Sequence, residues 1–95
     1  MHIKTVEIEF DPAKSATNEI RRGLPFSLVA GFDWDSAVVL PDTRKAYAEP
    51  RFLALSMIGR RLHAVVFTPT VAGVRVISFR KANRREGRKH DQAKS

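Results

Sequence analysis

From residue 37 onward, the chain contains four strand-like segments that are separated by short, turn-forming sequences. Glycine or proline occurs in each separating sequence, at residues 41–42, 59–61 and 69–73, and two of these are short enough to close hairpins. Strands connected in this way usually pair with their neighbours along the chain. The pattern therefore predicts an antiparallel meander of about four strands, at residues 37–40, 51–58, 62–67 and 74–79.

The first half of the chain predicts one short strand and two helices. Apolar residues at positions 6, 8 and 10 alternate with two glutamates, and this two-residue period is typical of a half-buried strand. Residues 27–31 predict a very short helix that begins at Ser27, a residue type that favours the N-terminal cap. The other helix is longer and precedes it.

This longer helix is expected over residues 12–22. Asp11 can accept hydrogen bonds from the free N–H groups of the first turn, Pro12 suits the first helical position, and Gly23 suits the end. Small and apolar residues recur at helical spacing within it. They predict a narrow buried stripe made of Ala13, Ala16, Thr17 and Ile20.

Together these elements predict an α+β fold. The N-terminal helices would pack on the antiparallel sheet, and residues 83–89 can form a short C-terminal helix, although Gly87 weakens it by roughly 1 kcal/mol. A chain of 95 residues suffices for a single domain that spans residues 1–95. A domain of this size buries roughly 60 to 65% of the surface that its unfolded chain exposes.

The positive charge of the chain lies in its second half. Residues 1–50 hold six Lys or Arg and eight Asp or Glu, whereas residues 51–95 hold eleven and two, so net charges of −2 and +9 sum to +7. Residues 80–94 alone hold seven of the cations and two acids. This asymmetry indicates a polyanionic partner, which could be RNA, DNA, an anionic membrane or an acidic protein.

The sequence contains no pattern of a metal site, a reactive thiol or a membrane segment. There is no cysteine, and the three histidines, His2, His63 and His90, do not have the spacing of metal ligands. No apolar run approaches the roughly 20 residues that span a bilayer, and residues 1–10 alternate charged with apolar side chains, unlike a signal sequence. We therefore expect no metal, no cofactor, no membrane partner and a cytoplasmic location.

The last strand leads directly into the basic cluster. A regular two-residue period divides its side chains between two faces of the sheet. The first face is predicted to hold Val74, Val76, Ser78 and Arg80. The second face is predicted to hold Arg75, Ile77, Phe79 and Lys81.

Several arginines could act on a phosphodiester. Guanidinium groups that converge on one bind it and stabilise the negative charge that develops on phosphorus during cleavage. Strand pairing could bring Arg51, Arg60 and Arg61 near the final helix. In that helix Glu86 and His90 lie four residues apart on one face, as the acid and base of RNA cleavage would. An ordinary intrahelical Glu–His pair is the competing interpretation.

Short motifs run along most of the chain, from residue 8 to residue 91. The first are Phe10-Asp11-Pro12-Ala13-Lys14, Asn18, Arg21-Arg22-Gly23 and Phe32-Asp33. The next are Asp42-Thr43-Arg44, Glu49-Pro50-Arg51-Phe52, Ile58-Gly59 and Leu62-His63-Ala64-Val65-Val66-Phe67-Thr68. The most specific is Arg75-Val76-Ile77-Ser78-Phe79-Arg80-Lys81-Ala82-Asn83-Arg84-Arg85-Glu86. In order and spacing, these motifs resemble the BrnT family of type II toxin-antitoxin toxins, in the RelE-like ribonuclease group.

The resemblance implies a function, a partner and a set of site residues. It implies a RelE-like sheet with packed helices, endoribonuclease activity without a metal, and inhibition by a cognate BrnA-type antitoxin. Such an antitoxin carries a ribbon-helix-helix part, so DNA is contacted only through it. Where the motifs match, Arg51, Arg80, Lys81 and Glu86 are the expected catalytic residues, and we add His90. The expected RNA-binding residues are Arg60, Arg61, Arg84, Arg85, Arg88 and Lys89.

Three positions depart from the family pattern. Arg22 stands where the family commonly has histidine, which removes an imidazole. His90 stands where tyrosine is common and keeps a group that can transfer protons, whereas Gly87 replaces a larger apolar residue. These departures are compatible with an attenuated toxin.

Two simpler interpretations compete with a nuclease. A basic C-terminal helix can be a solvated surface without a specific role. The charge asymmetry also suits a non-catalytic basic module that binds a partner or nucleic acid within a repressor complex, and such a module needs neither Glu86 nor His90. His63 lies in an apolar run and is interpreted as a hydrogen-bonded residue of the sheet rather than a catalyst.

Overall fold

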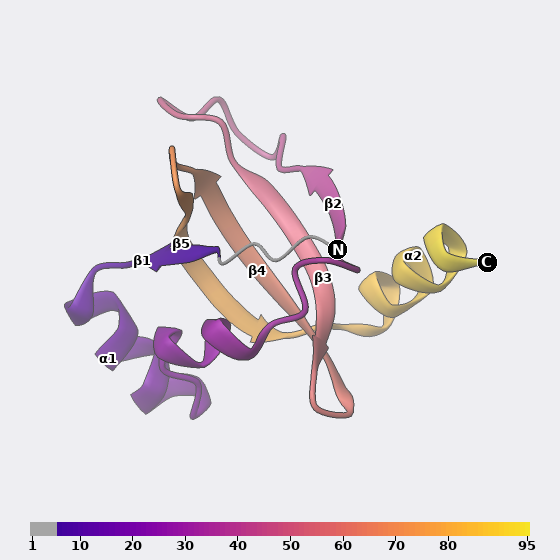
Figure 1. Cartoon of the computed structure of the whole chain (residues 1–95), viewed down its shortest axis with the longest axis horizontal. Helices are drawn as coiled ribbons and strands as arrows, with labels where there is room; N and C mark the ends of the chain where they lie inside the picture. The colour runs from indigo at the N-terminus through magenta and orange to yellow at the C-terminus, as the bar shows by residue number, and fades with distance from the viewer. Residues whose placement is uncertain (1–5) are drawn as a thin grey trace.

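A five-stranded sheet forms the centre of the computed structural model, which describes residues 6–95 (Figure 1). Its strands are β1 (Glu7–Glu9), β2 (Val38–Pro41), β3 (Phe52–Ile58), β4 (Arg61–Pro69) and β5 (Gly73–Lys81). The helices are α1 (Pro12–Arg22), the 3₁₀ helix η1 (Phe26–Gly31) and α2 (Arg84–Lys94). In Figure 1, α1 and η1 lie at one side of the sheet and α2 at the other. The predicted α+β class is confirmed.

The predicted meander consists of β2 to β5, because each of these strands pairs antiparallel with the next one along the chain. The strand order is β1-β5-β4-β3-β2, so β1 lies at the outer edge of β5. The expectation of about four strands in an antiparallel sheet was wrong, because β1 adds a fifth strand that runs parallel to β5. The alternation at residues 6–10 indicated this strand but not its partner.

Gly73 allows β1 to approach β5. It pairs with Glu7, and a Cβ atom at position 73 would collide with the carbonyl group and nitrogen of Glu7. Backbone atoms cannot turn aside as the end of a long side chain can, so the pairing requires glycine here. The sequence suggested a turn at this position, whereas the structure uses the glycine for close contact between two strands.

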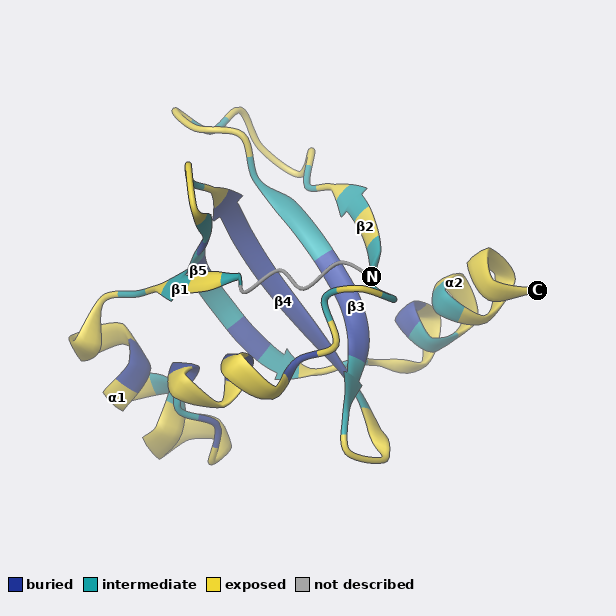
Figure 2. Ribbon diagram, in the orientation of Figure 1, coloured by how far each residue is buried: buried dark blue, intermediate teal, exposed yellow. Residues whose placement is uncertain are grey.

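The main hydrophobic core lies on the face of the sheet that meets η1. The sheet contributes Ala54, Val65, Phe67, Val74, Val76 and Phe79, and the segment after α1 contributes Leu24, Phe26, Val29 and Phe32. In Figure 2 the buried residues concentrate in β3 and β4, whereas α1 is mostly exposed. Complete burial of an apolar side chain of this size contributes about 1.5 to 3 kcal/mol, so these contacts are what fixes η1 on the sheet.

A β-bulge in β5 decides which way Arg80 points. Between the residues that pair with Val66 and Phe67, β5 contains one extra residue, Ile77. One extra residue shifts the alternation of all the following side chains to the opposite face. Phe79 therefore lies in the core, fully buried, and Arg80 points to the other face of the sheet. The predicted division of this strand into two faces was wrong for this reason.

Polar side chains, rather than the predicted apolar stripe, attach α1 to the rest of the fold. The buried hydroxyl of Ser15 accepts a hydrogen bond from the backbone N–H of Phe26 at 2.8 Å. The side-chain amide of Asn18 donates to the carbonyl oxygens of Leu24 at 2.6 Å and Phe79 at 2.9 Å. Ile20, assigned to the stripe, is 86% exposed. Spacing alone identified a helix here but not the side that it buries.

The ends of α1 follow the sequence signals. The carboxylate of Asp11 accepts a hydrogen bond from the N–H of Ala13 at 2.9 Å, and Pro12 is the first helical residue. Gly23 ends the helix with a φ of 71°, a left-handed conformation that glycine adopts without strain. The short second helix is a 3₁₀ helix that begins one residue before Ser27, and no side chain caps it.

Candidate functional site

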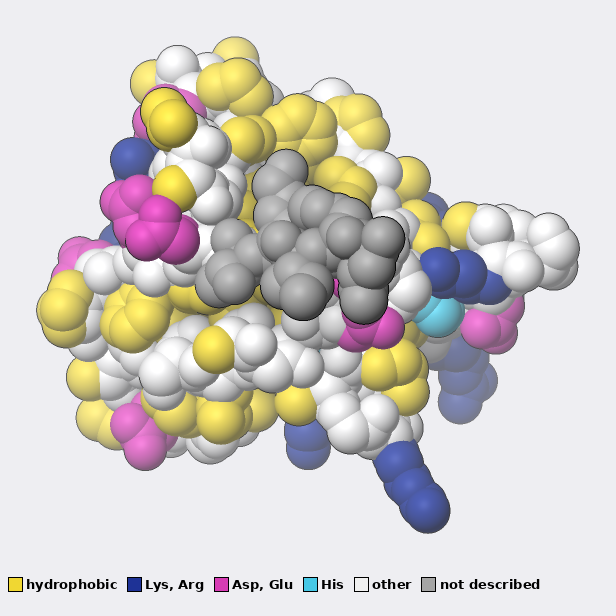
Figure 3. All heavy atoms as spheres, viewed as in Figure 1, with side chains coloured by type: hydrophobic (Ala, Val, Ile, Leu, Met, Phe, Trp, Pro, Cys, Tyr) yellow, Lys and Arg dark blue, Asp and Glu magenta, His cyan; other side chains and the backbone are white. Residues whose placement is uncertain are grey.

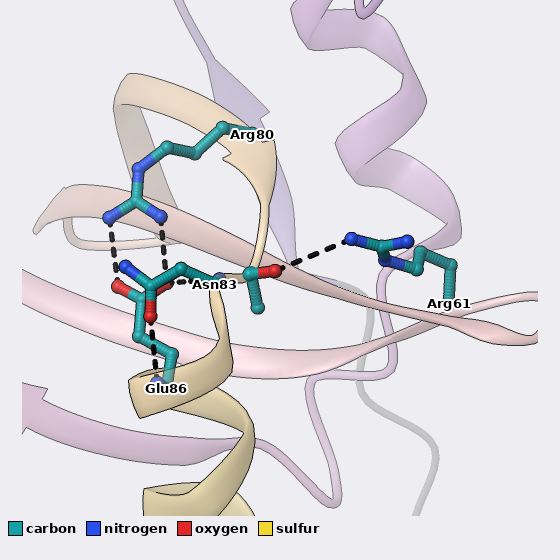
Figure 4. Close-up of polar contacts among 5 residues, drawn as sticks. Arg61, Arg80, Asn83 and Glu86 are labelled. Carbon is teal, nitrogen blue, oxygen red and sulfur yellow. Dashed lines mark hydrogen bonds and ion pairs between the residues drawn. The ribbon is translucent and has the colours of Figure 1, made fainter.

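The carboxylate of Glu86 joins the start of α2 to the end of β5 (Figure 4). Arg80 donates to it through both terminal nitrogens, Nη1 to Oε1 at 2.7 Å and Nη2 to Oε2 at 2.8 Å. Oε1 also accepts from the backbone N–H of Asn83 at 2.9 Å, while the Asn83 side-chain oxygen accepts from the N–H of Glu86 at 2.8 Å. This capping box starts α2 at Arg84. The helix continues to Lys94, beyond its predicted end at residue 89.

The pair of Arg80 and Glu86 is largely withdrawn from solvent, with side-chain exposures of 26% and 9%. The hydrogen bonds from Arg80 hold the pKa of Glu86 below its usual value, against the opposing effect of burial. The same bonds raise the pKa of Arg80. Glu86 is therefore an ionised carboxylate whose two oxygens already accept three hydrogen bonds. Glu86 is therefore better suited to orient Arg80 as an anion than to act as a base that takes protons from a ligand.

Replacing Glu86 with glutamine should destabilise the protein in a pH-dependent way. Loss of the charged acceptor is expected to cost about 2 kcal/mol, which corresponds to a decrease in Tm of roughly 8 to 16 °C at this size. Because the pKa of Glu86 is lower in the folded state, its contribution is complete above its usual value of 4.5 and is lost as pH falls through the lowered pKa. Thermal unfolding of both proteins between pH 3 and pH 8 measures this.

A matched variant on the same helix serves as the control for Glu86→Gln. Lys94→Gln alters an exposed residue in the last turn and leaves the capping box intact. Its Tm should follow that of the unaltered protein at every pH. A difference between the Glu86→Gln and unaltered proteins that stays constant down to pH 3 would contradict the assignment.

Arg80 opens onto a groove of about 450 Å³ on the face of the sheet opposite the main core. Aliphatic side chains of three strands line its base, namely Leu40, Leu53 and Val66. Its polar lining comes from the start of α2 and from the segment after β2, namely Asp42, Thr43, Arg44, Arg80, Asn83, Arg85, Glu86 and Lys89. An apolar surface bordered by cations suits a ligand that has a flat apolar part and a negative charge.

The structure brings together only some of the residues that the sequence assigned to the site. Arg80, Glu86, Arg85 and Lys89 line the groove. Lys81 follows Arg80 on the strand, and the alternation directs it to the opposite face of the sheet. Two further cations of α2, Arg84 and Arg88, are exposed and lie outside the groove lining.

Arg51 and the hairpin arginines lie away from the groove. Arg51 stacks over the ring of Tyr47 at 4.1 Å and lines a neighbouring depression. Arg61 lies at the turn between β3 and β4, and its Nη2 donates to the carbonyl oxygen of Ala82, just before α2, at 3.5 Å (Figure 4). The hairpin therefore does approach the final helix, as predicted, through Arg61. Arg60 is exposed in the same turn.

The two described histidines have different surroundings. His63 is buried, and its Nδ1 donates to the carbonyl oxygen of Arg61 at 2.8 Å, since a carbonyl oxygen can only accept. Its interpretation as a hydrogen-bonded sheet residue is confirmed. His90 is half-buried on α2, with its Nδ1 3.8 Å from the Asp91 carboxylate. Glu86 pairs with Arg80, so the competing interpretation of an intrahelical Glu86–His90 pair is wrong.

Arg44 is a groove residue that the sequence analysis did not assign to the site. Its Nε and Nη2 donate to Oδ1 and Oδ2 of Asp42, each at 2.8 Å. The Asp42 side chain is 4% exposed and that of Arg44 is 69% exposed, so a buried carboxylate holds an exposed cation. The available signal was the Asp42-Thr43-Arg44 motif.

Charge is unevenly distributed over the surface of the described residues. In Figure 3, Lys and Arg side chains gather around α2 and the lower end of the sheet, and Asp and Glu gather mainly on the opposite side. Within residues 6–95 no three His, Asp or Glu side chains form a cluster that could hold a metal ion, and His2 lies outside this range. None of the helices described here has both the length and the apolar character to cross a bilayer.

Comparison with known proteins gives one match. A family model described as the ribonuclease toxin BrnT, of type II toxin-antitoxin systems, matches residues 10–86. The match contains Arg80, Glu86 and Arg44, and it ends before the last two turns of α2. No curated protein and no solved structure matches the chain.

Proposed function

Because the chain belongs to the BrnT family of type II toxin-antitoxin ribonuclease toxins, we propose that it cleaves RNA, without a metal ion, at the groove beside Arg80. The observation that carries this proposal is the bidentate contact between Arg80 and Glu86 at the edge of that groove. Arg80 has five N–H donors, and among the described residues Glu86 takes two of them. The remaining three can bind the non-bridging oxygens of a phosphate.

In the proposed reaction, the 2′-oxygen of the RNA attacks the neighbouring phosphorus. The bond between this oxygen and phosphorus forms, and the bond from phosphorus to the 5′-oxygen breaks, which gives a cyclic phosphate and a free 5′-hydroxyl. Arg80 stabilises the extra negative charge on phosphorus, and Arg85 and Lys89 add positive charge from α2. Because Glu86 fixes the guanidinium beforehand, little reorganisation is needed when the charge develops.

Proton transfer is the second requirement of this chemistry. The 2′-hydroxyl must lose a proton and the 5′-oxygen must gain one. We assign the orienting role to Glu86. His90 lies one helical turn further along α2, outside the groove lining, and is the side chain proposed for proton transfer. Lys81, Arg51 and the exposed cations Arg60, Arg61, Arg84 and Arg88 are proposed to bind more distant RNA phosphates.

Incubating the purified protein with single-stranded RNA and excess EDTA tests the proposed function. We expect cleavage fragments that end in a cyclic phosphate, with a rate that EDTA does not change. His90→Gln should lower the cleavage rate, because it removes the side chain proposed for proton transfer. If intact RNA is recovered at all protein concentrations, and expression does not slow growth, the catalytic proposal is wrong. The non-catalytic basic module of a repressor complex then becomes the better account.

A cognate antitoxin is the proposed partner, as type II systems require. We propose that it is a BrnA-like protein with a ribbon-helix-helix part, and that an acidic segment of it covers Arg80 and the neighbouring cations of the groove. Fixed carboxylates compete with phosphate for guanidinium groups because both accept bidentate hydrogen bonds. Antitoxin addition should therefore block RNA binding as well as cleavage. A complex that still binds RNA at the groove with unchanged affinity would exclude this mode of inhibition.

A further inference from the structure

The groove holds a second fixed guanidinium besides that of Arg80. Arg44 and Arg80 both line it, and each is held by a bidentate contact to a carboxylate that is almost inaccessible to solvent. The two carboxylates, Asp42 and Glu86, belong to segments far apart in the sequence, one after β2 and one in α2. The same arrangement of a buried acid and an arginine thus occurs twice in one groove.

The two arginines lie within electrostatic reach of each other. The positive charge of Arg44 opposes the rise in the pKa of Arg80 that Glu86 causes. Two like charges near one groove repel each other, and an anion that lies between them is attracted by both. If Arg44 had only a structural role, its contact with Asp42 would be enough, and its side chain would not need to be exposed.

Arg44 retains donors for a ligand. Asp42 engages Nε and Nη2, which uses two of the five N–H donors of the guanidinium. The hydrogen bonds from Arg44 keep the pKa of Asp42 low, so this carboxylate remains ionised and keeps its hold. An arginine fixed in this way loses little side-chain entropy on binding, since its position is already set.

We propose that Arg44 and Arg80 bind successive phosphates of single-stranded RNA, with the intervening base lying on the apolar surface formed by Leu40, Leu53 and Val66. The proposal rests on the proposed function and extends it to the form of the substrate. A base in a duplex is stacked and paired, and so cannot reach this surface. The volume of about 450 Å³ lies within the range of pockets that hold small ligands.

The test uses an uncleavable RNA, a mixed-sequence single strand with 2′-O-methyl groups, and measures its affinity by fluorescence anisotropy. Arg44→Gln should weaken binding about 10- to 100-fold, as expected for loss of hydrogen bonds to a charged group. Lys45→Gln is the matched control, because this exposed neighbour loses the same charge but does not line the groove. It should change the affinity by no more than about two-fold, since salt screens an exposed charge.

Salt dependence separates a phosphate contact from a structural effect. Arg44→Gln should decrease the slope of log affinity against log salt by about 0.7, the value for one phosphate on a single strand. Asp42→Asn keeps the charge of Arg44 but removes the carboxylate that holds it in place. Binding should therefore weaken, while the slope of log affinity against log salt stays the same. The duplex form of the RNA should bind more weakly than the single strand.

The outcomes distinguish this inference from the proposed function. If Arg80→Gln weakens binding but Arg44→Gln behaves like Lys45→Gln, the role of Arg44 is wrong and the Arg80 site stands. If neither substitution affects binding, the groove does not bind RNA phosphates and this inference fails, whereas cleavage itself is decided by the assay with RNA and EDTA. Equal affinity for single strand and duplex would overturn the placement of the base. Arg44→Lys, which keeps the charge, should recover part of the affinity and controls for any loss of folding.

Discussion

Arg80→Gln is expected to lower kcat/KM for RNA cleavage by about 10² to 10³-fold. This loss corresponds to the 2.7 to 4 kcal/mol of transition-state stabilisation that one well-placed donor provides. Glutamine is shorter than arginine by two atoms and loses the bidentate contact with Glu86, but the capping hydrogen bonds between Asn83 and Glu86 do not involve residue 80, so the start of α2 should survive. Single-turnover cleavage of a labelled RNA at subsaturating protein measures kcat/KM, and at saturating protein it measures the chemical step separately from binding.

A substitution of the same chemical type elsewhere provides the control. Arg21→Gln removes one guanidinium from the exposed surface of α1, outside the groove lining. Its cleavage rate should remain within about two-fold of that of the unaltered protein, because salt screens exposed charges beyond roughly 10 Å. Equal losses in the two variants would mean that general positive charge, rather than a fixed donor at Arg80, supports cleavage.

Phe79→Ala should produce the largest loss of stability, about 3 to 5 kcal/mol. Phe79 is fully buried in the core, with its ring 5.5 Å from that of His63. A domain of this kind is stable by only about 5 to 15 kcal/mol, so the variant should be partly unfolded at 37 °C. Urea denaturation at 25 °C measures the change in the free energy of unfolding.

The matched variant is Ile77→Ala, which also tests the bulge. Strict alternation would place both residues on one face, but the extra residue in β5 leaves Ile77 half-exposed. Its replacement should cost about 1 kcal/mol, since the side chain is only partly buried and lies outside the main core, so less apolar surface is lost than at Phe79. Similar losses for Ile77→Ala and Phe79→Ala would be inconsistent with the bulge.

Local signals predicted most of the elements of this fold. The cap at Asp11, the proline after it and Gly23 set the limits of α1, since all of these act within a few residues. Short turns defined the meander for the same reason. The pairing of β1 with β5 was not predicted, because it depends on contact between Glu7 and Gly73, which lie far apart in the sequence. A two-residue period indicates a strand but not the strand with which it pairs.

The bulge and the site were predictable to different degrees. Ile77 looks like an ordinary strand residue, so its insertion and the resulting direction of Arg80 were not visible in the pattern. Arg80 and Glu86 belong to one family motif and were both assigned to the site, but their contact was not predicted. Arg44 was missed because its position in the groove depends on how the segment after β2 returns beside the sheet. That path follows from tertiary packing rather than from local sequence.

Because β1 pairs with β5, the sheet can be completed only late in the synthesis of the chain. Glu7 cannot take its place until Gly73 has been made, 66 residues later (73 minus 7). Glu86 follows later still, and without it Arg80 has no carboxylate to hold it. Ribosomes add roughly 5 to 20 residues per second, so the nascent chain spends several seconds without a finished sheet edge or a fixed guanidinium. The proposed nuclease therefore lacks its Arg80–Glu86 pair until nearly all of the chain has been translated.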